Sequence, residues 1–311
     1  MTAPRVSVVV PTYNRAALLP DTLRSILAQT VRDIEVLVVD NQSPYDLESL
    51  IRGLNDPRLR LFRFSNGGFI GAGRNHGLDN ARAPLTAFCD DDDLWLPEKL
   101  EKQLAAYDPT RHAGVATASV CEDVPAGRDR SWNYPRAEAT FEDLLLSGPP
   151  AISSLVARTA DLRFPVDPAI QHVEDWDLML RLTAEGKPLR VLPEPLLRYR
   201  IHGSNEGQEL GKTANALNVI ERHRSRMSED LYRRARARLY FVFGSMALER
   251  RLPGASNYFR DSYRARPSLR AAAGWTVGLL PAAARRGAVR AYRIFTGWIP
   301  AARVFAARRE G

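Results

Sequence analysis

Short strand-like segments recur early in the chain, the first of them a run rich in β-branched residues, and each stops abruptly at polar residues. The runs cover residues 6–10, 34–39, 59–64 and 85–89. Between the first two runs, leucine and isoleucine side chains recur at helical spacing over residues 18–27. A strand, a helix and a second strand in this order predict a parallel sheet. We therefore predict an α/β fold with a mainly parallel sheet flanked by helices. A glycine-rich stretch and then a helix over residues 74–80 follow the third run, and we expect a further strand over residues 115–120 and a helix over residues 173–182.

The polar residues that end these runs are the first indication of a functional site. They are Thr12-Tyr13-Asn14, Asp40-Asn41 and the four aspartates Asp90 to Asp93. Ligands in open α/β sheets bind beyond the carboxyl ends of the strands. If the three strands are neighbours, these side chains converge on one crevice. Asn14 is also placed to cap the helix that follows it.

The composition is that of a globular protein, and it excludes several other classes. Hydrophobic residues make up 45% of the 311 residues and charged residues 26%, which argues against disorder. Cys89 and Cys121 are too few for a disulfide framework and match no zinc-finger spacing. The first residues lack the apolar stretch of a signal peptide, and no apolar run is long enough to span a bilayer. We therefore expect a cytoplasmic protein.

Charge is distributed unevenly along the chain. The net charge is +8, yet residues 212–311 hold 21 Lys and Arg against 6 Asp and Glu, so the remainder is acidic. The composition also changes near residue 210, to alanine and arginine at helical spacing. We predict a catalytic domain over residues 1–210 and a basic α-helical region over residues 211–311. A strongly basic region implies an anionic partner, such as a membrane surface, nucleic acid or an acidic polymer.

The run Asp90-Asp91-Asp92-Asp93 carries the clearest chemical signal. Four adjacent carboxylates repel one another unless a cation offsets their charge. Oxygen ligands at a strand end suit Mg²⁺ or Mn²⁺, which can also hold substrate phosphates. The alternative is an acidic helix start ahead of Pro97, which the helix dipole would favour. The position directly after a buried strand favours the metal.

Further motifs follow in a fixed order over about residues 5–205. The series runs Val6 to Arg15 (VSVVVPTYNR), Ser25 to Thr30 (SILAQT), Glu35 to Asp40 (EVLVVD), Gly71 to Leu78 (GAGRNHGL), Phe88 to Trp95 (FCDDDDLW), Val173 to Leu178 (VEDWDL) and Tyr199 to His202 (YRIH). In this order the motifs resemble those of glycosyltransferase family 2, a large inverting family with the GT-A fold. One departure is the stretch from Asp40 to Ser43, which reads Asp-Asn-Gln-Ser where many members have Asp-Asp-Gly-Ser.

The resemblance implies a role for individual residues, carried over by position. Those that contact the nucleotide-sugar are Pro11, Tyr13, Asn14, Asp40, Arg74, Asp90 and Asp91. Asp40 would accept a hydrogen bond from a pyrimidine N–H, and Arg74 would lie beside the diphosphate. The metal, Mn²⁺ or Mg²⁺, would be held by Asp92 and His202, and Asp175 would be the general base. The expected donor is a UDP-sugar, although the altered stretch after Asp40 leaves the base open, and the acceptor is a glycan or lipid-linked hydroxyl.

The chemistry of an inverting transfer agrees with these roles. An acceptor hydroxyl must be activated on one face of the sugar while the diphosphate leaves from the other. A carboxylate can take the proton, and a divalent cation neutralises the leaving charge. Taken alone, Asp175 is a helix-capping acid and His202 a structural histidine. The sugar, the acceptor and the linkage stay open, with surface-polysaccharide or cell-envelope glycan synthesis as the pathway that the resemblance implies.

Two other functions compete with this interpretation. A metal-dependent nucleotidyltransferase also uses clustered aspartates, but it would normally have a glycine-rich loop early in the chain. The first loop here, residues 11–15, has no glycine. A non-catalytic, membrane-associated scaffold would not need to retain both the aspartate run and the pair Glu174-Asp175.

The basic region combines aromatic residues with arginines at helical spacing. Residues 235–267 vaguely resemble one tetratricopeptide-like helix pair, which cannot bury its own apolar face. Over residues 275–299, tryptophan, tyrosine and leucine alternate with arginine, as in a helix lying on anionic lipid. An ordinary packing domain with a solvated arginine face is the equal alternative. Nucleic-acid binding is less favoured, because no nucleic-acid motif accompanies the charge. Peripheral contact with the inner face of the plasma membrane is the corresponding expectation.

Overall fold

The chain divides into two compact units. The computed structural model describes residues 3–123, 128–132, 136–201, 213–250, 252–281, 284–285, 287–289 and 291–292. The first unit comprises Met1–Leu144, Pro149–Asp167 and Glu174–Ser204, and the second comprises Leu145–Gly148, Pro168–Val173 and Asn205–Gly311. The boundary predicted between residues 210 and 211 falls outside the described ranges and stays a prediction.

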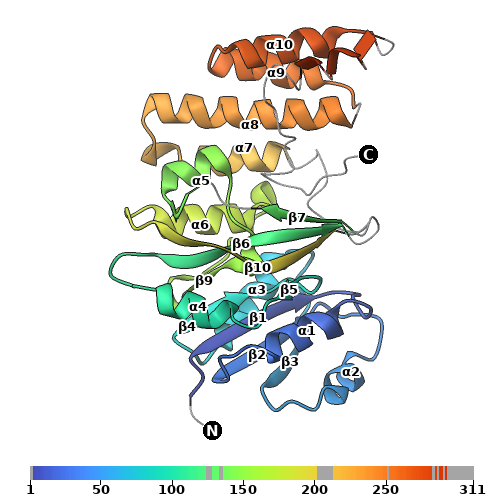
Figure 1. The fold of residues 1–311 in the computed structure, drawn as a ribbon, viewed down its shortest axis with the longest axis vertical. Helices are drawn as coiled ribbons and strands as arrows, with labels where there is room; N and C mark the ends of the chain where they lie inside the picture. The colour runs from blue at the N-terminus through green and yellow to red at the C-terminus, as the bar shows by residue number, and fades with distance from the viewer. Residues whose placement is uncertain are drawn as a thin grey trace. The chain divides into compact units, whose positions relative to one another are not determined.

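One sheet of ten strands forms the centre of the first unit (Figure 1). The strands are β1 (Val6–Thr12), β2 (Ile34–Asp40), β3 (Leu59–Arg63), β4 (Leu85–Phe88), β5 (Leu94–Trp95), β6 (Gly114–Asp123), β7 (Arg128–Trp132), β8 (Glu138–Ala139), β9 (Val156–Arg158) and β10 (Leu189–Ile201). They stand in the order β3-β2-β1-β4-β9-β6-β10-β5, with β7 beside β6 and β8 beside β10. The pairs β1–β2, β1–β4, β2–β3 and β6–β10 are parallel, whereas β5, β7, β8 and β9 pair antiparallel. The predicted α/β fold with a mainly parallel sheet is confirmed.

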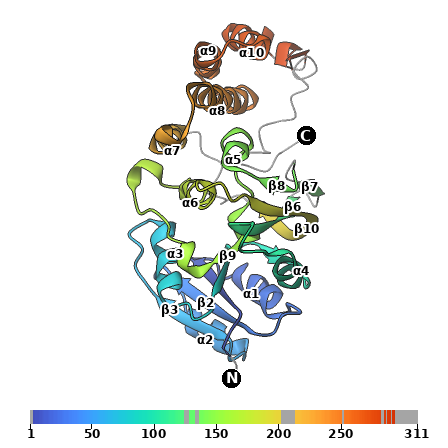
Figure 2. The same cartoon turned by 90° about the vertical axis from the view of Figure 1, so that its left-hand side faces the viewer.

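Helices cover both faces of the parallel strands (Figure 2). On one face, leucines from α1 (Leu19–Leu27), α2 (Leu47–Gly53) and α4 (Lys99–Ala106) pack against the even-numbered valines of β1 and β2. On the other face, α3 (Ile70–Asp79) lies against Val9 of β1. Because both faces are buried, β1 and β2 are continuous apolar runs and do not alternate with polar residues.

The helix α3 begins earlier than the sequence indicated. We predicted a helix over residues 74–80, because the glycines ahead of Arg74 suggested a loop. In the structure Gly71 lies inside the helix, where an added Cβ would come within 3.1 Å of Phe164 Cβ. An added Cβ on Gly77 would overlap the Val9 side chain. These glycines therefore permit close packing and do not break the helix.

The prediction that Asn14 caps α1 is wrong. The residue before the helix is Leu18, which makes no side-chain capping bond, and Pro20 stands near the start of the helix. Asn14 instead adopts a left-handed backbone conformation, with φ of 53°. Its backbone N–H donates to Ser43 Oγ at 2.9 Å, which joins the loop after β1 to the loop after β2.

Other predicted elements agree with the structure to within a few residues. The expected strand over residues 115–120 is the centre of β6, and the expected helix over residues 173–182 is α6 (Glu174–Thr183). A short helix, α5 (Phe141–Ser147), follows β8. Single turns of 3₁₀-helix lie at Ile152–Ser154, Thr159–Asp161, Pro168–Ile170 and Arg224–Arg226.

The second unit is helical. Its main helices are α7 (Thr213–Arg222), α8 (Glu229–Glu249), α9 (Ala255–Ala265) and α10 (Leu269–Leu279). The expected helix pair over residues 235–267 corresponds to part of α8 together with α9. The ring of Phe259 occupies the space left by Gly244 of α8 and Gly274 of α10, and it also packs edge to face on Tyr292. Within the described ranges, each helix is too short or too polar to cross a bilayer.

Candidate active site

Three strand ends lie side by side at one edge of the sheet. Thr12 at the end of β1 is in register with Asp40 at the end of β2, and Val9 of β1 is in register with Phe88 at the end of β4. The four aspartates follow β4 directly. The condition for a shared crevice, that the three strands are neighbours, is therefore met.

Asp91 holds the loop that follows β1. Its Oδ2 accepts hydrogen bonds from Thr12 Oγ1 at 2.7 Å and from the backbone N–H of Tyr13 at 3.3 Å. Burial, reinforced by the neighbouring charge of Asp92, raises the pKa of Asp91 to about 7. The Tyr13 side chain above this loop is 56% exposed. The structure thus gives Asp91 a supporting contact, and its predicted contact with the donor stays a prediction.

Arg15 connects two of the aspartates, and the sequence analysis assigned it no role. Its guanidinium nitrogens lie 3.5 Å from Asp91 Oδ1 and 3.8 Å from Asp92 Oδ2. A cation at this distance offsets part of the repulsion between the adjacent carboxylates. The feature of the sequence that could have indicated a role for Arg15 is its position directly after Asn14, inside the first motif.

Asp40 is fully buried at the end of β2. Its Oδ1 accepts the backbone N–H of Ser43 at 3.0 Å, and Arg63 Nη1 lies 3.7 Å from its Oδ2. Among the described residues, Oδ2 has no hydrogen-bond donor, so one acceptor is left for a ligand N–H. Pro11 is buried within β1, in register with Val39.

Arg74 joins the two acidic motifs. Its side chain, from α3, is 4% exposed and donates to Asp90 Oδ1 at 2.8 Å and to Glu174 Oε1 at 3.3 Å. The guanidinium also lies 5.2 Å from the centre of the Phe164 ring. The position of Arg74 beside a diphosphate stays a prediction, and its bridge between Asp90 and Glu174 was not predicted. The bridge brings the start of α6 to the aspartates that follow β4.

Asp175 stands at the start of α6, next to Glu174. Burial, followed by repulsion from Glu174, raises the pKa of Asp175 to about 6, while Arg74 opposes the shift. Asp175 Oδ1 accepts the backbone N–H of Trp176 at 2.8 Å, and the Trp176 indole donates to the Leu144 carbonyl at 3.0 Å. The carboxyl group is therefore oriented and has a pKa close to neutral, as a general base requires.

Arg200 fixes the turn that contains Asp92. Its buried guanidinium donates to the backbone carbonyl of Asp92, to the carbonyl of Leu18 at 3.2 Å and to Thr22 Oγ1 at 3.2 Å. The Arg200 backbone N–H also donates to Asp93 Oδ1 at 3.3 Å. Arg200 is part of the last motif, Tyr199 to His202, and no role was predicted for it.

The residues present fit a cation that arrives with a diphosphate. Across the described ranges, no three His, Cys, Asp or Glu side chains form a group that could hold a metal by themselves. His202 lies outside those ranges. Mg²⁺ is usually bound through one or two carboxylates together with substrate phosphates, and Asp90 and Asp92 supply such oxygens.

The family model described as Glycosyl transferase family 2 matches residues 7–152. An uncharacterised glycosyltransferase of Nostoc sp. is 29% identical over 217 residues, which cover 65% of this chain and 66% of the relative. The succinoglycan biosynthesis protein ExoW of Rhizobium meliloti is 41% identical over 102 residues, which cover 31% of this chain and 32% of the relative. The chain therefore matches a little under two thirds of the first relative's length and about a third of the second's.

Two solved structures share the fold along nearly the whole chain. TarS 1–349 of S. aureus, in complex with UDP-GlcNAc, superposes with a TM-score of 0.62 at 17% identity, covering 94% of this chain and 92% of that one. The mannosyltransferase PcManGT of Pyrobaculum calidifontis, in complex with GDP-Man and Mn²⁺, superposes with a TM-score of 0.59 at 20% identity, covering 95% and 86%. These similarities establish the GT-A fold.

The family match covers the strand ends, the aspartate run and Arg74, which are the parts that build this edge of the sheet. Residues 7–152 of the chain therefore match glycosyltransferase family 2.

Proposed function

We propose that this protein transfers a sugar, with inversion, from a nucleotide-diphosphate-sugar to a hydroxyl group of an acceptor. The observation that carries the proposal is the Arg74 bridge, which connects Asp90 after β4 with Glu174 at the start of α6. The bridge holds Asp90, which is suited to contact with a donor, beside the helix start that carries Asp175, the carboxylate suited to taking a proton.

Each predicted residue has a place in this proposal. Asp40 accepts a hydrogen bond from the base. The exposed ring of Tyr13, in the stretch from Pro11 to Asn14, lies against the base. Arg74 holds Asp90 for contact with the donor, and Asp91 keeps the loop after β1 in position. Asp175 takes the proton of the acceptor hydroxyl as the new bond forms, and the nucleoside diphosphate leaves from the opposite face of the sugar.

Mn²⁺ or Mg²⁺ would be held by Asp92, with Asp90 beside it, and by His202 from the segment after β10. When bound, the cation offsets negative charge on the leaving diphosphate. PcManGT was solved with Mn²⁺, which supports a divalent cation in this fold.

The donor we propose is a UDP-sugar, and the acceptor a glycan or lipid-linked hydroxyl in surface-polysaccharide or cell-envelope synthesis. UDP-GlcNAc bound to TarS and the name of the succinoglycan protein support this choice. A donor screen with Mn²⁺ tests it, scored by release of nucleoside diphosphate from common nucleotide-sugars. We expect release from a UDP-sugar, and none from the Asp92→Ala enzyme. Release of pyrophosphate from nucleoside triphosphates would instead identify a nucleotidyltransferase. Release of neither product would favour a non-catalytic, membrane-associated scaffold.

We also propose that the helical unit contacts an anionic membrane, at the inner face of the plasma membrane. The described part of α10 exposes Leu269 to 80% and Leu279 to 67%, with the exposed Arg270 beside the first. Trp275 and Tyr292 pack within the unit and so do not contribute to this exposed face. Exposed leucine next to arginine is the combination that favours binding at a lipid surface.

A further inference from the structure

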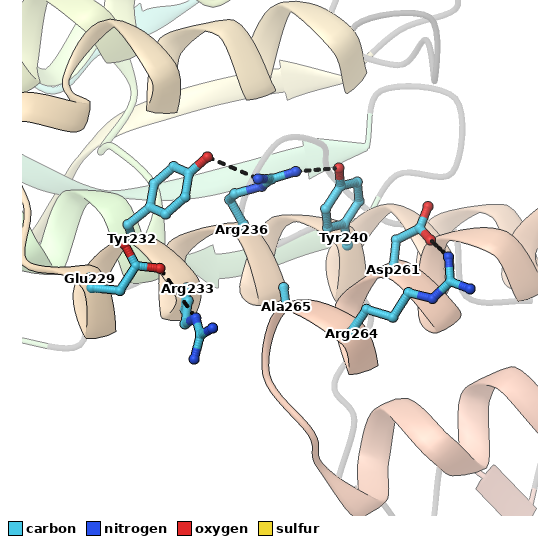
Figure 3. Close-up of a pocket in the computed structure, with 8 residues that line it drawn as sticks. All are labelled: Glu229, Tyr232, Arg233, Arg236, Tyr240, Asp261, Arg264 and Ala265. Carbon is cyan, nitrogen blue, oxygen red and sulfur yellow. Dashed lines mark hydrogen bonds and ion pairs between the residues drawn. The ribbon is translucent and has the colours of Figure 1, made fainter.

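A pocket lies between α8 and α9 in the helical unit, and no step of the proposed transfer uses it (Figure 3). Its volume is about 320 Å³, at the lower end of the range for pockets that bind small molecules. It is lined by Glu229, Tyr232, Arg233, Arg236, Tyr240, Asp261, Arg264 and Ala265. We refer to it as the α8–α9 pocket.

Arg236 forms a fixed donor group in this pocket. Tyr232, Arg236 and Tyr240 are spaced four residues apart on α8, so they share one face of the helix. Arg236 donates to the Tyr232 hydroxyl at 2.9 Å and to the Tyr240 hydroxyl at 3.2 Å, as Figure 3 shows. The guanidinium has five N–H donors and these two bonds occupy only part of them, so it retains donors for an anion.

The two tyrosines differ in what their hydroxyl protons can do. Tyr232 donates its proton to Glu221 Oε1 at 2.8 Å, and Arg224 covers its ring with the guanidinium carbon 4.4 Å from the ring centre. Tyr240 accepts from Arg236, and in the described part of the chain no acceptor takes its own proton. Tyr240 O–H is therefore available, beside Arg236, to donate to a ligand.

The rim of the pocket carries both signs of charge. Arg233 Nε lies 3.2 Å from Glu229 Oε1, and Arg264 Nη1 lies 3.9 Å from Asp261 Oδ1. Both arginine side chains are well exposed, at 65% and 71%, so these ion pairs are weak and can rearrange around a ligand. With Arg236 included, three arginines and two carboxylates line the pocket. Outside the lining, Arg224 also pairs with Glu229 at 2.5 Å and Arg260 with Asp261 at 3.1 Å.

The mixture of charges decides which ligand chemistry fits. A polyphosphate or a nucleic-acid backbone would bring negative charge against Glu229 and Asp261. A sugar can donate its hydroxyl protons to those carboxylates, while one carboxylate or phosphate group accepts from Arg236 and Tyr240. We infer that the α8–α9 pocket binds an acidic carbohydrate. This site is separate from the donor site at the sheet edge, and the inference holds whether or not that site transfers a sugar.

Calorimetric titration of the full chain tests the inference with three probes: a galacturonic acid trimer, glucose 6-phosphate and the neutral maltotriose. We expect saturable binding of at least one acidic probe and none of maltotriose, and the probe that binds identifies the anionic group. The Tyr240→Phe substitution removes one hydroxyl and keeps the ring, so the fold should survive. It should lower the affinity about tenfold, the loss of one hydrogen bond to a charged group, and Arg236→Gln should lower it at least as much.

Arg234→Gln is the matched control, because it removes one positive charge from α8 outside the pocket lining. We expect its affinity to equal that of the unmodified protein. An affinity unchanged in Tyr240→Phe, or lowered equally in Arg234→Gln, would overturn the inference, as would equal binding of maltotriose. Displacement by a single-stranded oligonucleotide at lower concentration than by the acidic sugar would overturn it in favour of nucleic acid.

Discussion

At the scale of single residues, Asp175 and Arg74 derive their properties from their surroundings in the fold. Asp175 is an ordinary carboxylate in the sequence, and its pKa of about 6 arises from burial and from Glu174. Arg74 is one of many arginines, and its place between Asp90 and Glu174 gives it a distinct role. Substitution of Asp175 tests the rate of the proposed reaction, and substitution of Arg74 tests the stability of the fold.

Replacing Asp175 with asparagine removes the proton acceptor and changes little in shape. We expect kcat to fall about 100- to 10,000-fold, the usual contribution of a general base. The affinity for the nucleoside diphosphate, measured by titration, should stay within about twofold, because in the proposed reaction Asp175 acts on the acceptor and not on the donor. A fully active Asp175→Asn enzyme would exclude Asp175 as the base.

The pH dependence of the reaction follows from the same carboxyl group. A base works only when deprotonated, so protonation below its pKa removes activity. With a pKa of about 6, kcat/KM should fall about tenfold for each pH unit below that value and level off above it. A profile of initial rates between acidic and neutral pH checks this, and constant rates well below pH 6 would contradict it.

Removing Arg74 takes away the cation shared by the buried Glu174 and the partly buried Asp90. We expect Arg74→Ala to lower the free energy of unfolding by about 3–5 kcal/mol, as for other broken buried ion pairs. Urea denaturation of the full chain measures the change. Arg24→Ala is the control, since Arg24 pairs with Asp21 at the surface, and it should change the free energy by less than about 1 kcal/mol. Equal effects from the two substitutions would show that the bridge does not stabilise the fold.

At the scale of elements, α3 and the strands differ in how far the sequence predicts them. Runs rich in valine and isoleucine located β1 and β2, because strands buried on both faces contain mostly apolar residues. The start of α3 was missed, because a glycine-rich segment looks like a loop until the facing surface is known. Arg15 and Arg200 were missed for a related reason, since their contacts depend on how three separate loops meet.

The packing of α3 on β1 gives a second stability prediction. A methyl group on Gly77 would overlap Val9, so Gly77→Ala should lower the free energy of unfolding by about 1–3 kcal/mol. Gly73→Ala is the matched control in the same helix, because the nearest atom to its new methyl group would be 3.8 Å away. Thermal denaturation measures both variants. Restoration of stability in a Gly77→Ala, Val9→Ala double variant would locate the effect at this contact, and equal Tm values for the single variants would contradict it.

At the scale of the whole molecule, the chain combines an acidic N-terminal part with a basic C-terminal part. The charge totals predicted an anionic partner but not where it binds, because charge alone does not distinguish a lipid surface from an acidic sugar. The structure supplies separate candidates, the exposed leucines of α10 and the α8–α9 pocket. The two can be tested independently.

Flotation with vesicles that contain anionic lipid tests the membrane contact. The full-length protein should float with the vesicles at low salt, and high salt should release it, because exposed charges are screened. A Leu269→Gln, Leu279→Gln double variant should float less, since it loses apolar area at the surface while its charge is unchanged. Equal recovery of both proteins in the unbound fraction would exclude the contact.

Because β10 lies between β6 and β5, the candidate site can be completed only after β10 has been synthesised. β5, which follows the aspartates directly, pairs only with β10 among the described strands, and Arg200 of β10 fixes the carbonyl of Asp92. A ribosome makes residues 90–95 well before residue 200, so the nascent chain lacks the contacts that hold its acidic turn for about a third of its synthesis. The acidic turn therefore reaches its final structure only after the last strand of the sheet, β10, has been translated.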